Sequence, residues 1–150
     1  HAGVEAVYHL ARIGGVDVAA YGEYELGFNG DPDGVEAKLL LQRRTRLWDL
    51  RFNLIAEKPL DSTAPTEFAY ATSADVAVTD NLRLGATAFG DLGTGRRLFP
   101  YAEHYVGPMA KLRVPLGSHR LRIETGYLFA VAKAREDANG QFRLNLEFEL

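Results

Sequence analysis

The sequence contains no cysteine, and this absence excludes several kinds of chemistry at once. The 150-residue chain therefore has no disulfide scaffold, no thiol nucleophile and no cysteine-ligated metal. It also lacks an apolar run of about 20 residues, so the sequence offers no candidate transmembrane helix. The formal net charge is only -3 at pH 7, which leaves no basic field for nucleic acid, and no nucleic-acid partner is expected.

What the chain does contain is the composition of an ordinary folded protein. Apolar residues make up 47% and charged residues 25% of the sequence, a balance far from that of disordered chains. A chain of this length is large enough for one core and too short for two. We therefore expect a single domain over residues 1–150.

Strict alternation of apolar and polar residues is the dominant pattern. In residues 141–150, Phe142, Leu144 and Leu146 alternate with polar neighbours such as Arg143 and Asn145. A period of two is typical of β-strands with one apolar face, and no segment shows a convincing helical period. The sequence thus predicts an all-β, antiparallel, up-and-down fold, with strands near 3–11, 16–28, 35–43, 46–57, 67–78, 81–90, 103–114, 119–131 and 141–150.

The connections between these strands alternate in length. Short turns are expected at 14–15, 44–45, 79–81 and 116–118, and longer loops rich in Gly, Pro, Asp and Ser at 29–34, 58–66, 91–102 and 133–140. Short turns on one rim and long loops on the other are typical of outer-membrane barrels. The pattern places the C-terminal end of the last strand on the rim of the short turns.

Side-chain volume indicates which face is the inner one. The apolar face is bulky, with Trp48, Phe52, Tyr127 and Phe129 among its leucines, and it would overfill a narrow barrel. The polar face combines charges with small residues, which suits a narrow lumen. We therefore predict a transmembrane β-barrel with a lipid-facing apolar exterior; the alternative is a soluble, lipocalin-like barrel around a small hydrophobic ligand. Aromatics expected to form interfacial girdles are Tyr21, Tyr24, Phe28, Phe99, Tyr101, Tyr105 and Phe148.

Two residues depart from the regular alternation of a barrel strand, and the number of predicted strands is odd. Leu40 falls on the polar face, and Pro108 lies within a strand, where we expect a bulge or local break. Nine strands are predicted, whereas single-chain bacterial barrels have even numbers. Either the barrel has eight strands and residues 1–14 form an extra or terminal segment, or the chain supplies the nine C-terminal-most strands of a larger barrel.

The last strand resembles a known family signal. Residues 144–150 resemble the C-terminal assembly signal of Gram-negative outer-membrane barrels, and residues 47–57, 89–90 and 104–108 resemble proteobacterial barrel proteins, some associated with the degradation of aromatic compounds. The resemblance implies location in the bacterial outer membrane and recognition by the barrel-assembly machinery through the last strand. It brings no catalytic residues.

The candidate functional residues are charged side chains that are predicted to face the lumen. Glu57 is predicted to face the lumen as well. Their charges nearly balance, and buried charges must be paired or solvated, so such a network either holds a small barrel shut or lines a selective conduit. The predicted lumen network consists of Glu23, Glu25, Glu36, Lys38, Asp49, Arg51, Glu67, Asp75, Arg83, Lys111, Arg113, Arg120, Arg122, Glu124, Arg143 and Glu147.

The remaining motifs favour no enzyme. Arg96 and Arg97 lie in a glycine-rich loop followed by a strand rather than a helix, which argues against nucleotide binding. We expect a mobile outer loop there, and the alternative is contact of the two arginines with lipopolysaccharide phosphates. Residues 31–34 are expected to form a turn and not a calcium loop. The histidines have no metal-ligand spacing. We therefore predict no catalysis, cofactor or metal, and a structural or small-molecule transport role with membrane lipid as partner.

Overall fold

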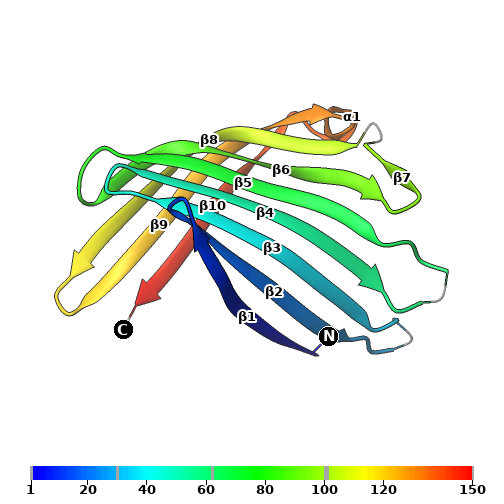
Figure 1. The fold of residues 1–150 in the computed structure, drawn as a ribbon. Coiled ribbons are helices and arrows are strands. Elements are labelled where there is room, and N and C mark those ends of the chain that lie inside the picture. Colours follow the sequence, from blue (N-terminus) through cyan, green and yellow to red (C-terminus); the bar gives the residue numbers. More distant parts are fainter. Residues whose placement is uncertain (1, 30, 62, 100–101, 150) are drawn as a thin grey trace.

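A computed structural model describes residues 2–29, 31–61, 63–99 and 102–149. The chain is a run of β-strands with one helical turn (Figure 1). In chain order the elements are β1 (Ala2–Ile13), β2 (Val16–Leu26), β3 (Gly34–Arg44), β4 (Trp48–Pro59), β5 (Glu67–Ala77), β6 (Leu82–Thr94), β7 (Arg97–Leu98), β8 (Glu103–Leu116), β9 (His119–Ala132), α1 (Ala134–Asp137) and β10 (Gly140–Glu149). All nine predicted strands are present; β7 and α1 lie in segments predicted as loops.

The strands form one antiparallel up-and-down sheet. Its order is β1-β2-β3-β4-β5-β6-β8-β9-β10, with β7 paired to β6. Residues 3–11 belong to β1, which pairs with β2 from Ala2 to Ile13. Residues 1–14 therefore contain the extra strand that was one of the two predictions for this segment, because β1 is a full strand of the sheet. The sheet is open, with β1 and β10 as its edges in the described part of the chain.

The predicted sorting of turns and loops is confirmed. The turns after β1, β3, β5 and β8 lie on one rim, and the connections after β2, β4, β6 and β9 begin and end on the other (Figure 1). Gly14 and Gly15 have φ values of 59° and 81°, the left-handed conformation that a two-residue hairpin turn requires and that glycine adopts without strain. β10 ends beside Arg120, near the 117–118 turn, as predicted. β6 continues to Thr94, so residues 91–94 are strand and not loop.

Among the described residues, the sheet departs from regular pairing at the predicted place, Pro108, and at two further places. The register shifts between His9 and Ala11 in β1, and between Phe68 and Ala69 where β5 meets β6. At Pro108 there is a local break but no bulge, because the β8–β9 pairs skip residues 107–108 and resume in the same register. Proline lacks the N–H that a ladder bond requires, which explains the gap.

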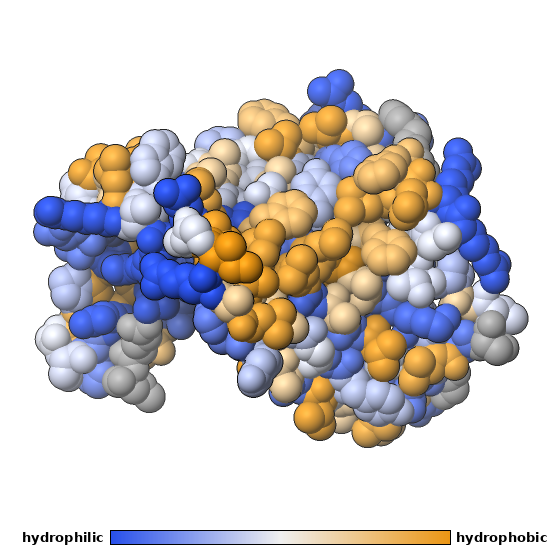
Figure 2. All heavy atoms as spheres, in the orientation of Figure 1, coloured by the Kyte–Doolittle hydropathy of each residue, from blue (hydrophilic) through white to orange (hydrophobic). Residues whose placement is uncertain are grey.

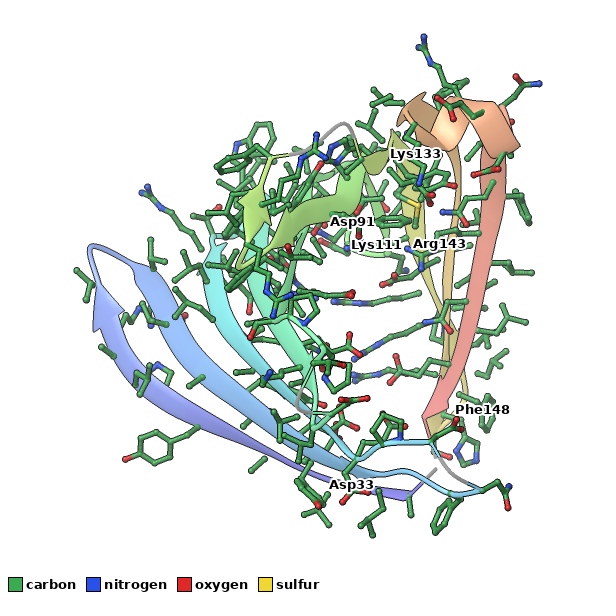
Figure 3. The ribbon with its side chains drawn as sticks, turned by 90° about the vertical axis from the view of Figure 1, so that its right-hand side faces the viewer. Asp33, Asp91, Lys111, Lys133, Arg143 and Phe148 are labelled. Carbon is green, nitrogen blue, oxygen red and sulfur yellow. The ribbon has the colours of Figure 1, made fainter. Side chains whose placement is uncertain are left out.

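The two faces of the curved sheet differ sharply. Lys111 and Arg143 point into its hollow, whereas Phe148 points outward (Figure 3). Large apolar side chains are exposed on the outer face, for example Phe52 at 39%, Phe129 at 54% and Leu146 at 59%. Figure 2 shows apolar residues gathered across the middle of the face in view. Apolar burial is confined, among the described residues, to Ala102, Leu128, Ala130 and Ala134 near α1.

Two aromatics predicted for the outer girdle lie on the concave face instead. Tyr21 shares its face with Glu23, to which its hydroxyl donates a hydrogen bond of 2.6 Å. Tyr105 stacks on Phe89 with ring centroids 5.2 Å apart, and by its register it lies on the same side as Lys111. Tyr101 lies outside the described residues. In the described part of the chain, no helix has the length and apolar character needed to cross a membrane.

Candidate functional site on the concave face

Strand register places every residue of the predicted charge network on one face. Cross-strand partners share a face in an antiparallel sheet, and the ladders join Glu23 with Glu36, Arg83 with Lys111, and Arg122 with Glu147. The network does not form a single cluster. It divides into a group near the short turns, which contains both aspartates, and a glutamate-rich group near the long loops.

Asp75 is the centre of the first group. Its residue is only 3% exposed, and its carboxylate accepts hydrogen bonds from the Arg83 guanidinium and, at 2.9 Å, from the Lys111 ammonium. Arg83 also donates to the Leu47 carbonyl oxygen at 3.2 Å. A buried carboxylate requires such partners, because an unpaired charge away from water is very costly.

The sequence makes room for this carboxylate. Gly85 is the cross-strand partner of Asp75, and a Cβ atom at Gly85 would lie 2.6 Å from the Asp75 Cα and Cβ atoms. A side chain on Gly85 would therefore push β6 away from Asp75. The glycine allows the close approach of backbone to side chain that buries the carboxylate.

Asp49 is the centre of a second, neighbouring ion cluster. It is 4% exposed and accepts hydrogen bonds from Gln42 at 2.8 Å and from the Arg51 Nη2 atom at 3.0 Å. The Arg44 Nε atom lies 4.0 Å from its carboxylate. Asp49 and Asp75 are cross-strand partners, so the two clusters are adjacent.

The rest of the short-turn half is less tightly held. Arg122 lies 3.5 Å from Glu147, and the Arg143 guanidinium lies 4.9 Å from the centre of the Phe89 ring. Arg113 and Arg120 are exposed, and neither makes a salt bridge within the described part of the chain.

The long-loop half carries a row of glutamates. Glu5, Glu23, Glu36, Glu57 and Glu67 are successive cross-strand partners from β1 to β5. Glu25 lies on the same face two residues beyond Glu23 in β2. Lys38 is the cation of this group: its Nζ atom lies 2.7 Å from Glu36 and 4.3 Å from the centre of the Tyr21 ring. The Tyr21 hydroxyl oxygen also lies 2.6 Å from a Glu5 carboxylate oxygen, so Glu5 and Glu23 share its single proton.

Cavities occupy both halves of the concave face. The larger, of about 750 Å³, lies at the short-turn rim. Its charged lining residues are Arg44, Arg46, Asp49, Arg51, Asp75, Asp80, Arg83, Lys111, Arg113, Arg122, Glu124 and Glu147. A second cavity, of about 410 Å³, lies near the long loops and is lined by Glu57, Glu67, Asp91, Glu103 and Lys133 among others.

Several members of the site were not predicted from the sequence. Glu5 and Tyr21 share the parity of the charged residues on their strands, and this signal could have placed both inside. Gln42 and Arg44 have the parity of Lys38, but their contacts with Asp49 depend on the register of β3 against β4. Arg96 and Arg97 are exposed at the β6–β7 turn, and their contact with lipopolysaccharide remains a prediction.

Metal binding depends on groups of ligand side chains, and catalysis at a histidine depends on the contacts of its ring. No group of three or more His, Asp or Glu residues could hold a metal ion within the described residues. His9 lies 3.6 Å from Asp17, and His104 lies 3.5 Å from the Tyr70 hydroxyl. The Asp33 carboxylate accepts hydrogen bonds from the Tyr24 hydroxyl and from the Gly27 N–H, and both lower the pKa of Asp33.

Comparison with known proteins adds no relative. No protein-family model matches the chain, and no similar protein was found among curated proteins or solved structures.

Proposed function

We propose that this chain forms part of the wall of a bacterial outer-membrane β-barrel, with its convex face in lipid and its charged concave face lining the lumen. Its role is structural or lies in the passage of small molecules, without catalysis. The loop that contains Arg96 and Arg97 then faces lipopolysaccharide. The barrel-assembly machinery recognises the C-terminal strand.

The distribution of apolar side chains carries this proposal. Among the described residues, 28 large apolar side chains are exposed, whereas the buried apolar residues are Leu128 and three alanines. Soluble monomers rarely expose contiguous apolar patches larger than a few hundred Å². A soluble, lipocalin-like barrel would instead point these side chains toward its ligand. Lipid is the solvent that suits a bulky apolar exterior around a polar interior.

Strand length supports the same conclusion. The nine long strands have 10 to 14 residues, roughly twice the average of about 5–6 in soluble proteins. Eleven residues at about 3.3 Å each and a tilt of about 40° climb roughly 28 Å. This height matches the apolar band of about 25 Å in outer-membrane barrels.

The strand count favours a wall larger than the sheet described. β1 and β10 are separated by eight antiparallel pairings, so they run in the same direction. They cannot close on each other as an antiparallel pair. An odd number of further strands between them restores the alternation and gives an even total. A barrel of more than about eight strands has a lumen that side chains alone do not fill, which favours passage of solutes over a plug.

The test is the requirement for detergent. The purified protein should be monodisperse in detergent micelles and should aggregate when detergent is removed, measured by size-exclusion chromatography with light scattering. A monodisperse monomer in detergent-free buffer would contradict the membrane proposal and favour the soluble, ligand-binding alternative.

A further inference from the structure

We propose that the cavity at the short-turn rim, here called the basic cavity, binds small dianions such as phosphate or dicarboxylates. The inference names a ligand class for one end of the proposed lumen and rests on the proposed function only in that the concave face is open to solutes. The observations that carry it are the excess of cations, their fixed positions and the contrast with the opposite end.

The basic cavity holds more positive than negative charge. Seven Arg or Lys side chains and five carboxylates line it. The excess is built into the two buried clusters: Asp75 lies between Arg83 and Lys111, and Asp49 has both Arg51 and Arg44 within 4.0 Å. Each cluster pairs two cations with one aspartate, and the other three cations of the lining are matched in number by Asp80, Glu124 and Glu147. The lining therefore keeps an excess of two positive charges. A dianion bound in the basic cavity would balance this excess.

The cations are held in place before any ligand arrives. The side chains of Arg83 and Lys111 are only 15% and 21% exposed, and both contact a carboxylate that is itself buried. Guanidinium groups present planar forks of N–H donors that match the oxygens of phosphate and carboxylate. Lys111 has three donors, of which Asp75 accepts one at 2.9 Å. Preorganised donors bind with little loss of side-chain entropy.

The size of the basic cavity and the chemistry of the opposite end both restrict the ligand. A volume of about 750 Å³ lies within the range of roughly 300–1,000 Å³ for small-molecule sites. The cavity near the long loops has four carboxylates, Glu57, Glu67, Asp91 and Glu103, with Lys133 as their cation. This end repels anions, so an anion in the lumen settles at the short-turn rim.

The test uses residues that line the basic cavity without holding a buried aspartate. Arg46 and Arg113 are exposed lining residues, so the double variant Arg46→Gln, Arg113→Gln should fold as the parent does. Arg96→Gln with Arg97→Gln is the matched control, because it removes the same charge from the opposite rim. The full chain in detergent is titrated calorimetrically with inorganic phosphate and, separately, with succinate, at low ionic strength and low chloride. Circular dichroism verifies that each variant is folded.

The parent should bind phosphate, succinate or both in a saturable manner. Without Arg46 and Arg113 the lining has five cations against five carboxylates. Binding should then weaken by about tenfold or more, because the excess of positive charge is lost, whereas the control should change it less than twofold. Saturable binding to neither probe, or equal weakening in both double variants, would overturn the anion site. If the protein needs detergent but binds neither anion, the proposed function stands and the anion site is overturned. If the protein is a detergent-free monomer that binds phosphate, the anion site stands and the membrane proposal is overturned.

Discussion

At the scale of the residue, the fold depends on two aspartates that it buries almost completely. Asp49 and Asp75 are 4% and 3% exposed, and each is surrounded by cations from neighbouring strands. The sequence predicted that both face inward, because alternation is local. Which cation meets which carboxylate is not local: Lys111 is 36 residues from Asp75, and their contact depends on two registers across β6. Pairing of this kind cannot be predicted from alternation alone.

Removing the charge of Asp75 tests this cluster. Asp75→Asn keeps the shape but leaves Arg83 and Lys111 facing each other without their counter-ion. Breaking a buried ion pair costs about 3–5 kcal/mol; because both cations retain some contact with solvent, we expect about 2–3 kcal/mol here. Urea-induced unfolding of the protein in lipid vesicles measures the loss.

Asp80→Asn is the matched control for the Asp75 variant. Asp80 is exposed in the 78–81 turn, where substitutions usually change stability by less than about 0.5 kcal/mol. Equal stability of the Asp75 and Asp80 variants would mean that the Asp75 cluster contributes nothing to the fold.

At the scale of the element, sequence reasoning is strongest where the signal is short-ranged. The nine strands and the two classes of connection follow from period-two alternation and turn residues, and both were predicted. Tyr21 and Tyr105 were placed outside because they lie near strand ends, although their parity with charged neighbours puts them inside. The register shifts near His9 and Phe68 carry no local signal. The glycine at position 85 is visible in the sequence, but its role requires knowing that Asp75 is its partner.

β1 provides the element-scale test of the larger wall. In an antiparallel edge strand, alternate N–H groups point away from the single neighbour. If a further strand pairs with β1 in the native protein, the amides of β1 should be protected from hydrogen exchange as strongly as those of β3. β3 is the reference because it has neighbouring strands on both sides. Exchange measured by mass spectrometry on the protein in detergent, with β3 as internal reference, gives the answer. Rapid exchange of every second β1 amide would identify β1 as a true edge.

At the scale of the whole molecule, the account depends on which face meets lipid. The chain has a single tryptophan, and Trp48 lies at the beginning of β4, 48% exposed. Replacing it by phenylalanine gives a background in which one introduced tryptophan reports its own surroundings. Neighbouring residues of β10 offer the sharpest comparison, because Asn145 and Leu146 are both exposed but point to opposite faces of the same strand.

The most direct measurement is therefore fluorescence quenching by lipids brominated in the middle of their acyl chains. In the Trp48→Phe background, we compare Leu146→Trp with Asn145→Trp after reconstitution into vesicles, with non-brominated vesicles as reference. The account predicts strong quenching and blue-shifted emission for Leu146→Trp and little quenching for Asn145→Trp, because only the convex face contacts lipid. Equal quenching at both positions, stronger quenching at Asn145→Trp, or no quenching at either would contradict the assignment of the apolar face to the membrane.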